Sequence, residues 1–73
     1  MKTGLFFGSF NPIHIGHLNI AQYIINETDI EKVLFVVSPQ NPFKSENELW
    51  PFNKRFELVK KSIEGNPDFD VTD

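Results

Sequence analysis

Two continuous apolar runs enclose an amphipathic segment, and this order constrains the fold more than any other feature of the chain. The runs are Leu5–Phe7 (LFF) and Val33–Val37 (VLFVV), which are rich in β-branched and aromatic residues. Such runs are typical of parallel strands that are covered on both faces. The segment between them has apolar residues at spacings of three and four, which predicts an amphipathic helix that ends near residues 26–29. These positions are Leu18, Ala21 and Ile25.

A polar connection and a second predicted helix follow. Residues 38–51 (SPQNPFKSENELWP) contain three prolines, which predicts a long loop of the kind that is often functional. Apolar residues spaced 4, 3 and 4 then predict a helix with Asn53 as its N-cap, and Gly65 and Pro67 end it. Those apolar positions are Phe52, Phe56, Val59 and Ile63. The tail, residues 68–73, alternates acidic and apolar residues as a third strand would.

The order β-α-β-α-β implies an α/β fold with a parallel sheet and right-handed crossovers. A chain of 73 residues without cysteines is at the low end of what buries a core without help. Two helices leave the sheet with unprotected edges and little to cover its second face. We therefore expect residues 1–73 to be the front portion of a larger α/β domain, which in isolation folds poorly or self-associates through its exposed sheet edges.

Charge and hydropathy argue against two classes of partner. Seven Lys and Arg residues against ten Asp and Glu residues give a net charge of -3, which is unlike the basic surface of a nucleic-acid binder. The N-terminal apolar run is interrupted too early to form a signal-peptide core or a membrane span. We expect a cytoplasmic protein that binds neither nucleic acid nor membranes.

The stretch GSFNPIHIGH, Gly8–His17, occupies the first strand-to-helix turn. In open parallel sheets this turn is the usual place for phosphate. Gly8 lets the backbone approach a ligand closely, and Ser9 offers a hydroxyl and a backbone donor. His14 and His17 are three residues apart beside the positive end of the helix, where free backbone N–H groups would complete an anion cradle. The spacing alone leaves a structural role open, with His14 as a cap and His17 as a core histidine.

Other chemistries find less support in the sequence. Two histidines without a cysteine or a third ligand do not complete a zinc site, so no protein-bound metal is expected. The three spaced glycines of the dinucleotide fingerprint and the lysine of a P-loop are both missing from the turn. No pair of carboxylates is placed for general acid–base catalysis.

The stretch GSFNPIHIGH resembles the H-x-G-H signature of the nucleotidyltransferase superfamily, letters that also occur in class I aminoacyl-tRNA synthetases. Together with VLFVVSPQNPFK and NKRFELVKKSI, it makes nearly the whole chain similar to the bacterial nicotinate-nucleotide adenylyltransferase family. The resemblance implies that residues 1–73 form the N-terminal β-α-β-α part of a Rossmann-like nucleotidyltransferase domain. The second signature of that family, a Ser/Thr-rich stretch with an arginine, has no match after Lys44.

The resemblance implies adenylyl transfer from ATP to nicotinate mononucleotide, a step of NAD biosynthesis that gives deamido-NAD and pyrophosphate. Mg²⁺ would accompany ATP as part of the substrate, and the 73 residues alone are expected to be inactive. The catalytic residues implied by the resemblance are His14, His17 and Lys44. The nucleotide-binding residues implied by it are Gly8, Ser9, Phe10, His14, Gly16 and His17.

The chain departs from the usual pattern of that family, and other readings remain. Phe7, Ser9 and Asn11 stand where the family commonly has Gly, Thr and Asp, which bears on substrate details more than on the reaction class. The alternatives are a fragment of pantetheine-phosphate adenylyltransferase or of a cytidylyltransferase, and a non-catalytic module that binds nucleotide or self-associates. We expect a structural role for Arg55, through an acidic partner such as Glu57, and a loop-anchoring role for Trp50.

Overall fold

The secondary structure follows the predicted β-α-β-α-β order. A computed structural model describes residues 2–38 and 50–73. Its elements are β1 (Thr3–Gly8), α1 (Ile15–Glu27), β2 (Lys32–Val37), α2 (Phe52–Ser62) and β3 (Phe69–Thr72). The α/β fold class, the end of the first helix and the third strand are thereby confirmed, whereas most of the predicted long loop lies outside the described residues.

The three strands form one parallel sheet in the order β1-β2-β3. Gly8 lies opposite Val37 at the carboxyl ends of β1 and β2, and the Ser38 N–H continues the pairing by donating to the Gly8 carbonyl at 2.9 Å. The turn after β1 and the chain after β2 therefore leave the sheet at the same edge, where ligands bind in open parallel sheets.

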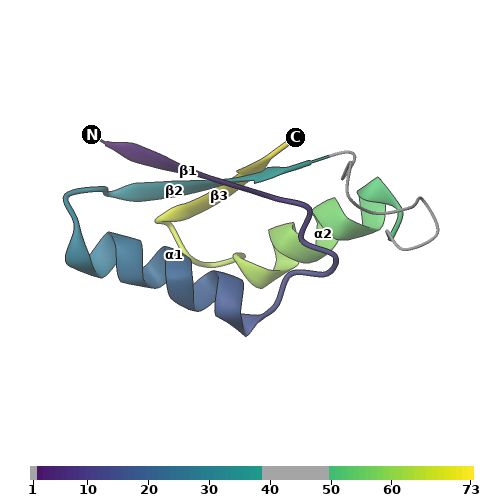
Figure 1. Ribbon diagram of the computed structural model, residues 1–73, viewed down its shortest axis with the longest axis horizontal. Coiled ribbons are helices and arrows are strands. Elements are labelled where there is room, and N and C mark those ends of the chain that lie inside the picture. The colour runs from purple at the N-terminus through teal and green to yellow at the C-terminus, as the bar shows by residue number, and fades with distance from the viewer. Residues whose placement is uncertain (1, 39–49) are drawn as a thin grey trace.

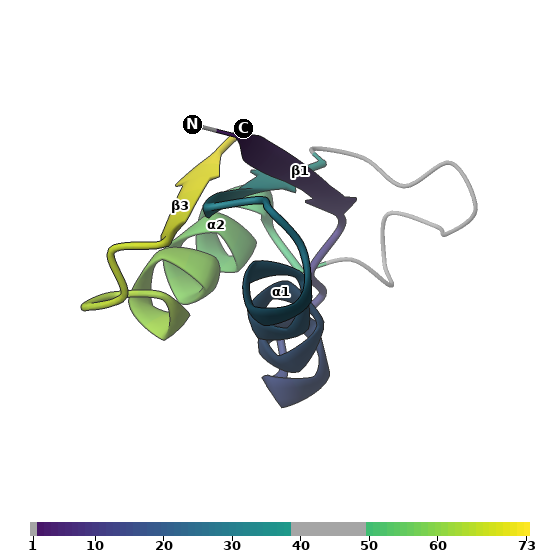
Figure 2. The ribbon, with the colours of Figure 1, turned by 90° about the vertical axis from the view of Figure 1, so that its left-hand side faces the viewer.

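Both helices pack against one face of the sheet, as Figure 2 shows. Two right-handed crossovers that step in the same direction across a sheet place their helices on the same side. The buried core lies between these layers (Figure 1). Its apolar members are Phe10, Ala21, Val33, Phe35, Val37, Val59, Ile63 and Phe69.

The opposite face of the sheet corrects the expectation that the apolar strands are covered on both sides. Burial alternates along β1, and the side chains of Leu5 and Phe7 are 57% and 68% exposed. Leu34 and Val36 lie beside them in the register and are half-buried. Within residues 2–38 and 50–73, no helix packs on this face, because both crossovers pass on the other side.

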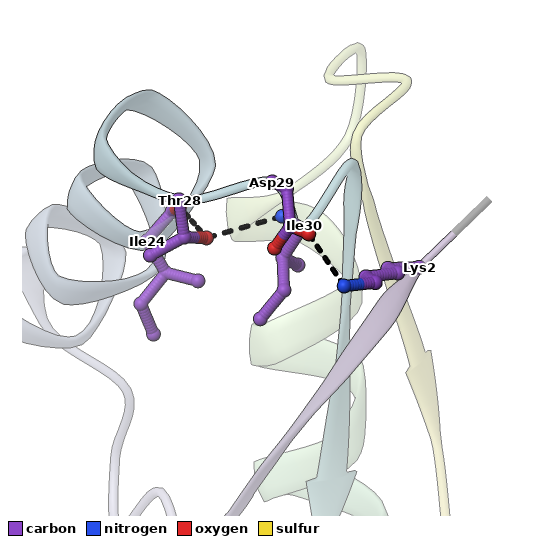
Figure 3. Close-up of polar contacts among 5 residues, drawn as sticks. All are labelled: Lys2, Ile24, Thr28, Asp29 and Ile30. Carbon is purple, nitrogen blue, oxygen red and sulfur yellow. Dashed lines mark hydrogen bonds and ion pairs between the residues drawn. The ribbon is translucent and has the colours of Figure 1, made fainter.

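The carboxyl end of α1 is closed by local hydrogen bonds (Figure 3). The Thr28 hydroxyl donates to the Ile24 carbonyl at 2.6 Å and accepts from the Ile30 N–H at 3.1 Å. Asp29 forms an ion pair with Lys2, next to the start of β1. The two hydrogen bonds of Thr28 therefore hold the short connection from α1 to β2.

The start of α2 differs from the prediction. The helix begins at Phe52, and its N-cap is Pro51, which makes no side-chain cap hydrogen bond. Asn53 is therefore not the cap, because the fixed backbone of proline already starts the helix and the Pro51 carbonyl accepts from Lys54 and Arg55. Neither described helix is long and apolar enough to cross a membrane.

The exposed sheet face predicts self-association of the 73-residue chain. We expect wild type to sediment as a concentration-dependent mixture of species, because contiguous exposed apolar side chains favour association. Phe7→Glu should shift the chain toward monomer. Tyr23→Glu is the matched control, because Tyr23 is a similarly exposed aromatic residue, at 65%, on α1. A wild-type monomer with a cooperative thermal transition would contradict this prediction.

Candidate active site

The turn between β1 and α1 is anchored by a buried aromatic residue. The side chain of Phe10 is only 2% exposed, although its backbone has a φ of 45°. A non-glycine residue in this left-handed region is strained by roughly 1 to 3 kcal/mol and persists only where its surroundings hold it. Here the ring centroid of Phe10 lies 5.5 Å from that of Phe6 and 5.0 Å from that of His17. Core packing of Phe10 therefore sets the path of the turn.

The same ring explains why a glycine stands at the end of β1. A Cβ atom added to Gly8 would lie 3.1 to 3.3 Å from carbon atoms of the Phe10 ring. That separation is tight for packed carbon atoms, whose optimal distance is about 3.5 to 4.0 Å. Packing against the Phe10 ring therefore favours glycine at position 8, whereas the expected place of Gly8 beside a nucleotide stays a prediction.

His14 and His17 bind the backbone of the first helical turn in a reciprocal way. His14 is the N-cap of α1, and its Nδ1 accepts from the Gly16 N–H at 3.0 Å. The Nδ1 of His17 accepts in turn from the His14 N–H at 3.0 Å. The arrangement has the logic of a capping box, with imidazoles in place of the usual hydroxyl and carboxylate. It brings the ring centroids of His14 and His17 to within 3.9 Å of each other.

Gly16 is required by the position of the His14 ring. A Cβ atom at Gly16 would lie 2.7 Å from Cε1 and 2.9 Å from Nδ1 of His14. Any larger residue would displace the ring and so disturb its bond to the Gly16 N–H. The H-x-G-H spacing therefore has a geometric cause in this chain: the glycine makes room for the first imidazole over the helix start.

The two caps also determine which ring nitrogen carries the proton. In a neutral imidazole one nitrogen is an acceptor and the other carries the hydrogen. Because Nδ1 accepts a main-chain N–H in both His14 and His17, each neutral ring carries its hydrogen on Nε2. The pair therefore has two Nε2–H donors that the caps do not use, close together at the positive end of α1.

Three of the backbone N–H groups beside the histidines are not free, contrary to the expectation. The Gly16 N–H is bonded to His14 Nδ1, and those of His17 and Leu18 both donate to the His14 carbonyl, at 3.0 and 3.4 Å. The caps take up these donors because the N-cap residue turns its side chain and its carbonyl toward the first turn. An anion at this site would consequently meet the imidazoles rather than these three main-chain groups.

The surroundings of His17 favour its neutral form. Its ring is half-buried and packs edge-on against Phe10, while His14 is exposed. Burial lowers the pKa of His17 from its usual 6.5, and the neighbouring His14 lowers it further. The first turn of α1 contains no acidic residue that would repel an anion. The arrangement can therefore donate two hydrogen bonds to an anion at neutral pH without a change of protonation at His17.

The other predicted residues divide between this turn and the part of the chain outside the structure. Ser9 is half-buried, and its carbonyl accepts from Arg55 at 2.8 Å. The structure thus places Gly8, Ser9, Phe10, Gly16 and the two histidines in or directly beside the turn between β1 and α1. Lys44 lies outside the described residues. Within the described chain, no group of three His, Cys, Asp or Glu side chains could hold a metal ion.

Sequence reasoning missed how closely the start of α2 is tied to this turn. Arg55 is 1% exposed and donates to three main-chain carbonyls, of Ser9, Ser38 and Trp50. Asn11 accepts from the Trp50 N–H at 2.7 Å, so it links the turn after β1 to the start of α2. The structural role expected of Arg55 is confirmed, but its described acceptors are main-chain carbonyls, and the described ion pairs do not include the expected acidic partner Glu57. The sequence signal for a buried Arg55 is its position within the apolar stripe of the helix, between Phe52 and Val59.

Comparison with known proteins assigns the fold and the turn to a family. The sequence pattern of the cytidylyltransferase-like family matches residues 5–73. The chain belongs to this family. Among solved structures, Plasmodium falciparum nicotinic acid mononucleotide adenylyltransferase complexed with NaAD superposes with a TM-score of 0.80. That comparison covers 100% of this chain and 37% of the other at 23% sequence identity, so it supports the fold alone.

Two relatives of this cytidylyltransferase-like chain carry the same name. A probable nicotinate-nucleotide adenylyltransferase of Bacteroides fragilis is 53% identical over 72 residues, which are 99% of this chain and 36% of that protein. The protein of the same name from Caldicellulosiruptor bescii is 53% identical over 73 residues, 100% of this chain and 37% of its own length. The chain therefore spans a little over a third of the relatives it matches.

The lowered pKa of His17 predicts a pH-dependent helix start. The unfolded chain binds a proton at His17 near pH 6.5, whereas the folded chain does so only at lower pH. The stability contributed by His17 is therefore complete above pH 6.5 and is lost as the pH falls through the folded pKa. Protonation at Nδ1 also removes the acceptor of the His14 N–H.

We expect the ring protons of His17 and the His14 amide to titrate together in NMR spectra recorded from about pH 7.5 to about pH 5, with a midpoint below the ordinary histidine value. His17→Asn is the control, because an amide oxygen accepts the same hydrogen bond without titrating in this range. A His17 midpoint above 6.5, or a His14 amide that does not move, would contradict the geometry.

Proposed function

We propose that this chain contributes the phosphate-binding turn of an adenylyltransferase that transfers AMP from ATP to nicotinate mononucleotide. The observation that supports this most strongly is the pair of imidazoles whose Nδ1 atoms are both engaged by main-chain N–H groups, which leaves two Nε2–H donors at a helix N-terminus. Curated relatives of about half identity, all named probable nicotinate-nucleotide adenylyltransferases, favour this substrate over those of the related transferases.

The proposed reaction needs positioning and charge stabilisation more than proton transfer. The 5′-phosphate of nicotinate mononucleotide attacks the α-phosphorus of ATP, the new P–O bond forms, and the bond to the β-phosphate oxygen breaks to release pyrophosphate. The nucleophile is already an anion, so no covalent intermediate with the protein is required. Charge increases on the transferring and leaving phosphates, and fixed donors lower the barrier by being stronger partners there than in the ground state.

His14 and His17 are proposed as those donors. Their rings are fixed before substrate arrives, by the caps and, for His17, by the Phe10 ring, so donation requires little reorganisation. Gly16 makes this placement possible, and Gly8, Ser9 and Phe10 are proposed to line the nucleotide with their backbone. Lys44 is proposed to add positive charge from the loop. Mg²⁺ enters with ATP and offsets part of the charge of the triphosphate.

Paired substitutions at His17 test the proposal, with the protein assayed at its full natural length. His17→Asn keeps an acceptor for the His14 N–H but lacks a donor at the position of Nε2. We expect it to fold normally and to lower turnover by about 10² to 10³, because that is the usual effect of removing one preorganised donor. The measurement is pyrophosphate release with ATP and nicotinate mononucleotide.

Two further variants serve as controls for that experiment. His17→Gln places an amide donor near the position of Nε2 and should retain more activity than His17→Asn. Asn19→Ala removes an exposed polar side chain from the same helix and should leave turnover unchanged. Turnover of His17→Asn equal to that of wild type would refute the proposed role, and wild type that releases no pyrophosphate would refute the proposed reaction.

A further inference from the structure

Arg55 lies at a point where three segments of the chain meet. Its Nε donates to the Trp50 carbonyl at 2.8 Å, and its Nη1 donates to the carbonyls of Ser9 at 2.8 Å and Ser38 at 2.7 Å. Ser9 belongs to the turn after β1, Ser38 follows β2, and Trp50 precedes α2. One buried side chain therefore joins three segments: the turn between β1 and α1 that leads to His14 and His17 (the histidine turn), the carboxyl edge of the sheet and the start of α2.

A second hydrogen bond joins the same segments without Arg55. The Trp50 N–H donates to Asn11 Oδ1 at 2.7 Å, while the Trp50 carbonyl accepts from Arg55. Ser9 and Asn11, on either side of Phe10, are thus both tied to the start of α2. The turn is held from two directions, by hydrogen bonds on one side and by packing of the Phe10 ring on the other.

The bond to Ser9 acts on the peptide that leads into the strained residue. The Ser9 carbonyl belongs to the Ser9–Phe10 peptide, and Phe10 has a φ of 45°. Fixing the plane of that peptide supports the left-handed backbone, which in turn holds the Phe10 ring against His17 at 5.0 Å. The effect of Arg55 therefore reaches His17 through Phe10, and Arg55 does not itself need to touch a substrate.

We propose that Arg55 is a positioning residue that holds the histidine-bearing turn in register with the carboxyl edge of the sheet. The inference rests on the proposed function and adds to it a residue from a different part of the chain. A lysine cannot replace it, because the guanidinium presents rigidly spaced donors to several acceptors, whereas an ammonium group is a compact point charge. The buried site also demands that the cation remain hydrogen-bonded.

Arg55→Lys and Arg55→Ala, compared with wild type at full natural length, test the inference. We expect Arg55→Lys to lower kcat per folded molecule on the order of 10², because small misplacements of catalytic groups are costly, while KM for ATP changes by less than about threefold. Methylguanidinium at millimolar concentration should restore turnover of Arg55→Ala, and methylammonium should not. Lys60→Ala is the matched control, because it removes an exposed cation from the same helix.

A purely structural role predicts a different result. The melting temperature of the Arg55 variants would fall, but kcat per folded molecule would equal that of wild type, and this outcome would overturn the inference. If Arg55→Ala does not fold, the kcat-to-KM comparison of Arg55→Lys decides, because that variant keeps the charge and most of the side-chain volume. If Arg55→Lys is also unfolded, recovery of turnover by either variant on addition of methylguanidinium supports the inference, and no recovery overturns it.

Failure of the proposed reaction can be distinguished from failure of the inference about Arg55. Wild type that releases no pyrophosphate refutes the reaction but leaves the positioning question to NMR. In that case, Arg55→Lys should shift the amide resonances of Phe10 and His17, while Lys60→Ala leaves them in place. Unchanged resonances in Arg55→Lys would overturn the inference.

Discussion

The hydrogen bond from the Gly16 N–H to His14 Nδ1 is the interaction on which the candidate site depends. It starts α1 at Ile15, and it places His14 so that its own N–H meets His17 Nδ1. The two bonds satisfy main-chain donors that a helix start otherwise leaves without partners. They also fix the tautomer of both rings, so the side chains that cap the helix are the same ones that are proposed to bind phosphate.

The remainder of the fold keeps this helix start in place. Phe10 anchors the turn from the core, Arg55 and Asn11 tie it to the start of α2, and Thr28 closes the far end of α1. The helices occupy one face of the sheet, and the turn leaves at its carboxyl edge. Local hydrogen bonds therefore determine the geometry of the histidine pair, and long-range contacts determine where that pair lies relative to the sheet.

Much of this arrangement could be predicted from the sequence. The apolar spacing identified both helices, continuous apolar runs identified the first two strands, and alternation identified the third, because such patterns reflect which side of an element is buried. The histidine turn could be located because a strand-to-helix connection in a parallel sheet has a defined place. The exposure of one face of the sheet could not be judged in this way, since the run LFF looks the same whether one face or both faces are covered, and Leu5 and Phe7 are exposed.

Other details depend on partners that are distant in the sequence. Arg55 lies 46 residues from Ser9 and 17 from Ser38, and carbonyl acceptors leave no trace in side-chain composition. The positive φ of Phe10 is equally hidden, because it arises from packing against Phe6 and His17 rather than from the preference of phenylalanine. The hydrogen bonds of the first-turn N–H groups were equally hidden, because they depend on how the His14 and His17 caps are oriented.

The tautomeric state of the histidine pair tests this account most directly. A long-range ¹H–¹⁵N correlation spectrum of the imidazole side chains, recorded at about pH 7.5 where neutral rings predominate, distinguishes a ring nitrogen that carries hydrogen from one that accepts. The account predicts that His14 and His17 both carry hydrogen on Nε2 and accept at Nδ1. Hydrogen on Nδ1 of either ring would contradict it, because that ring could not then cap the helix.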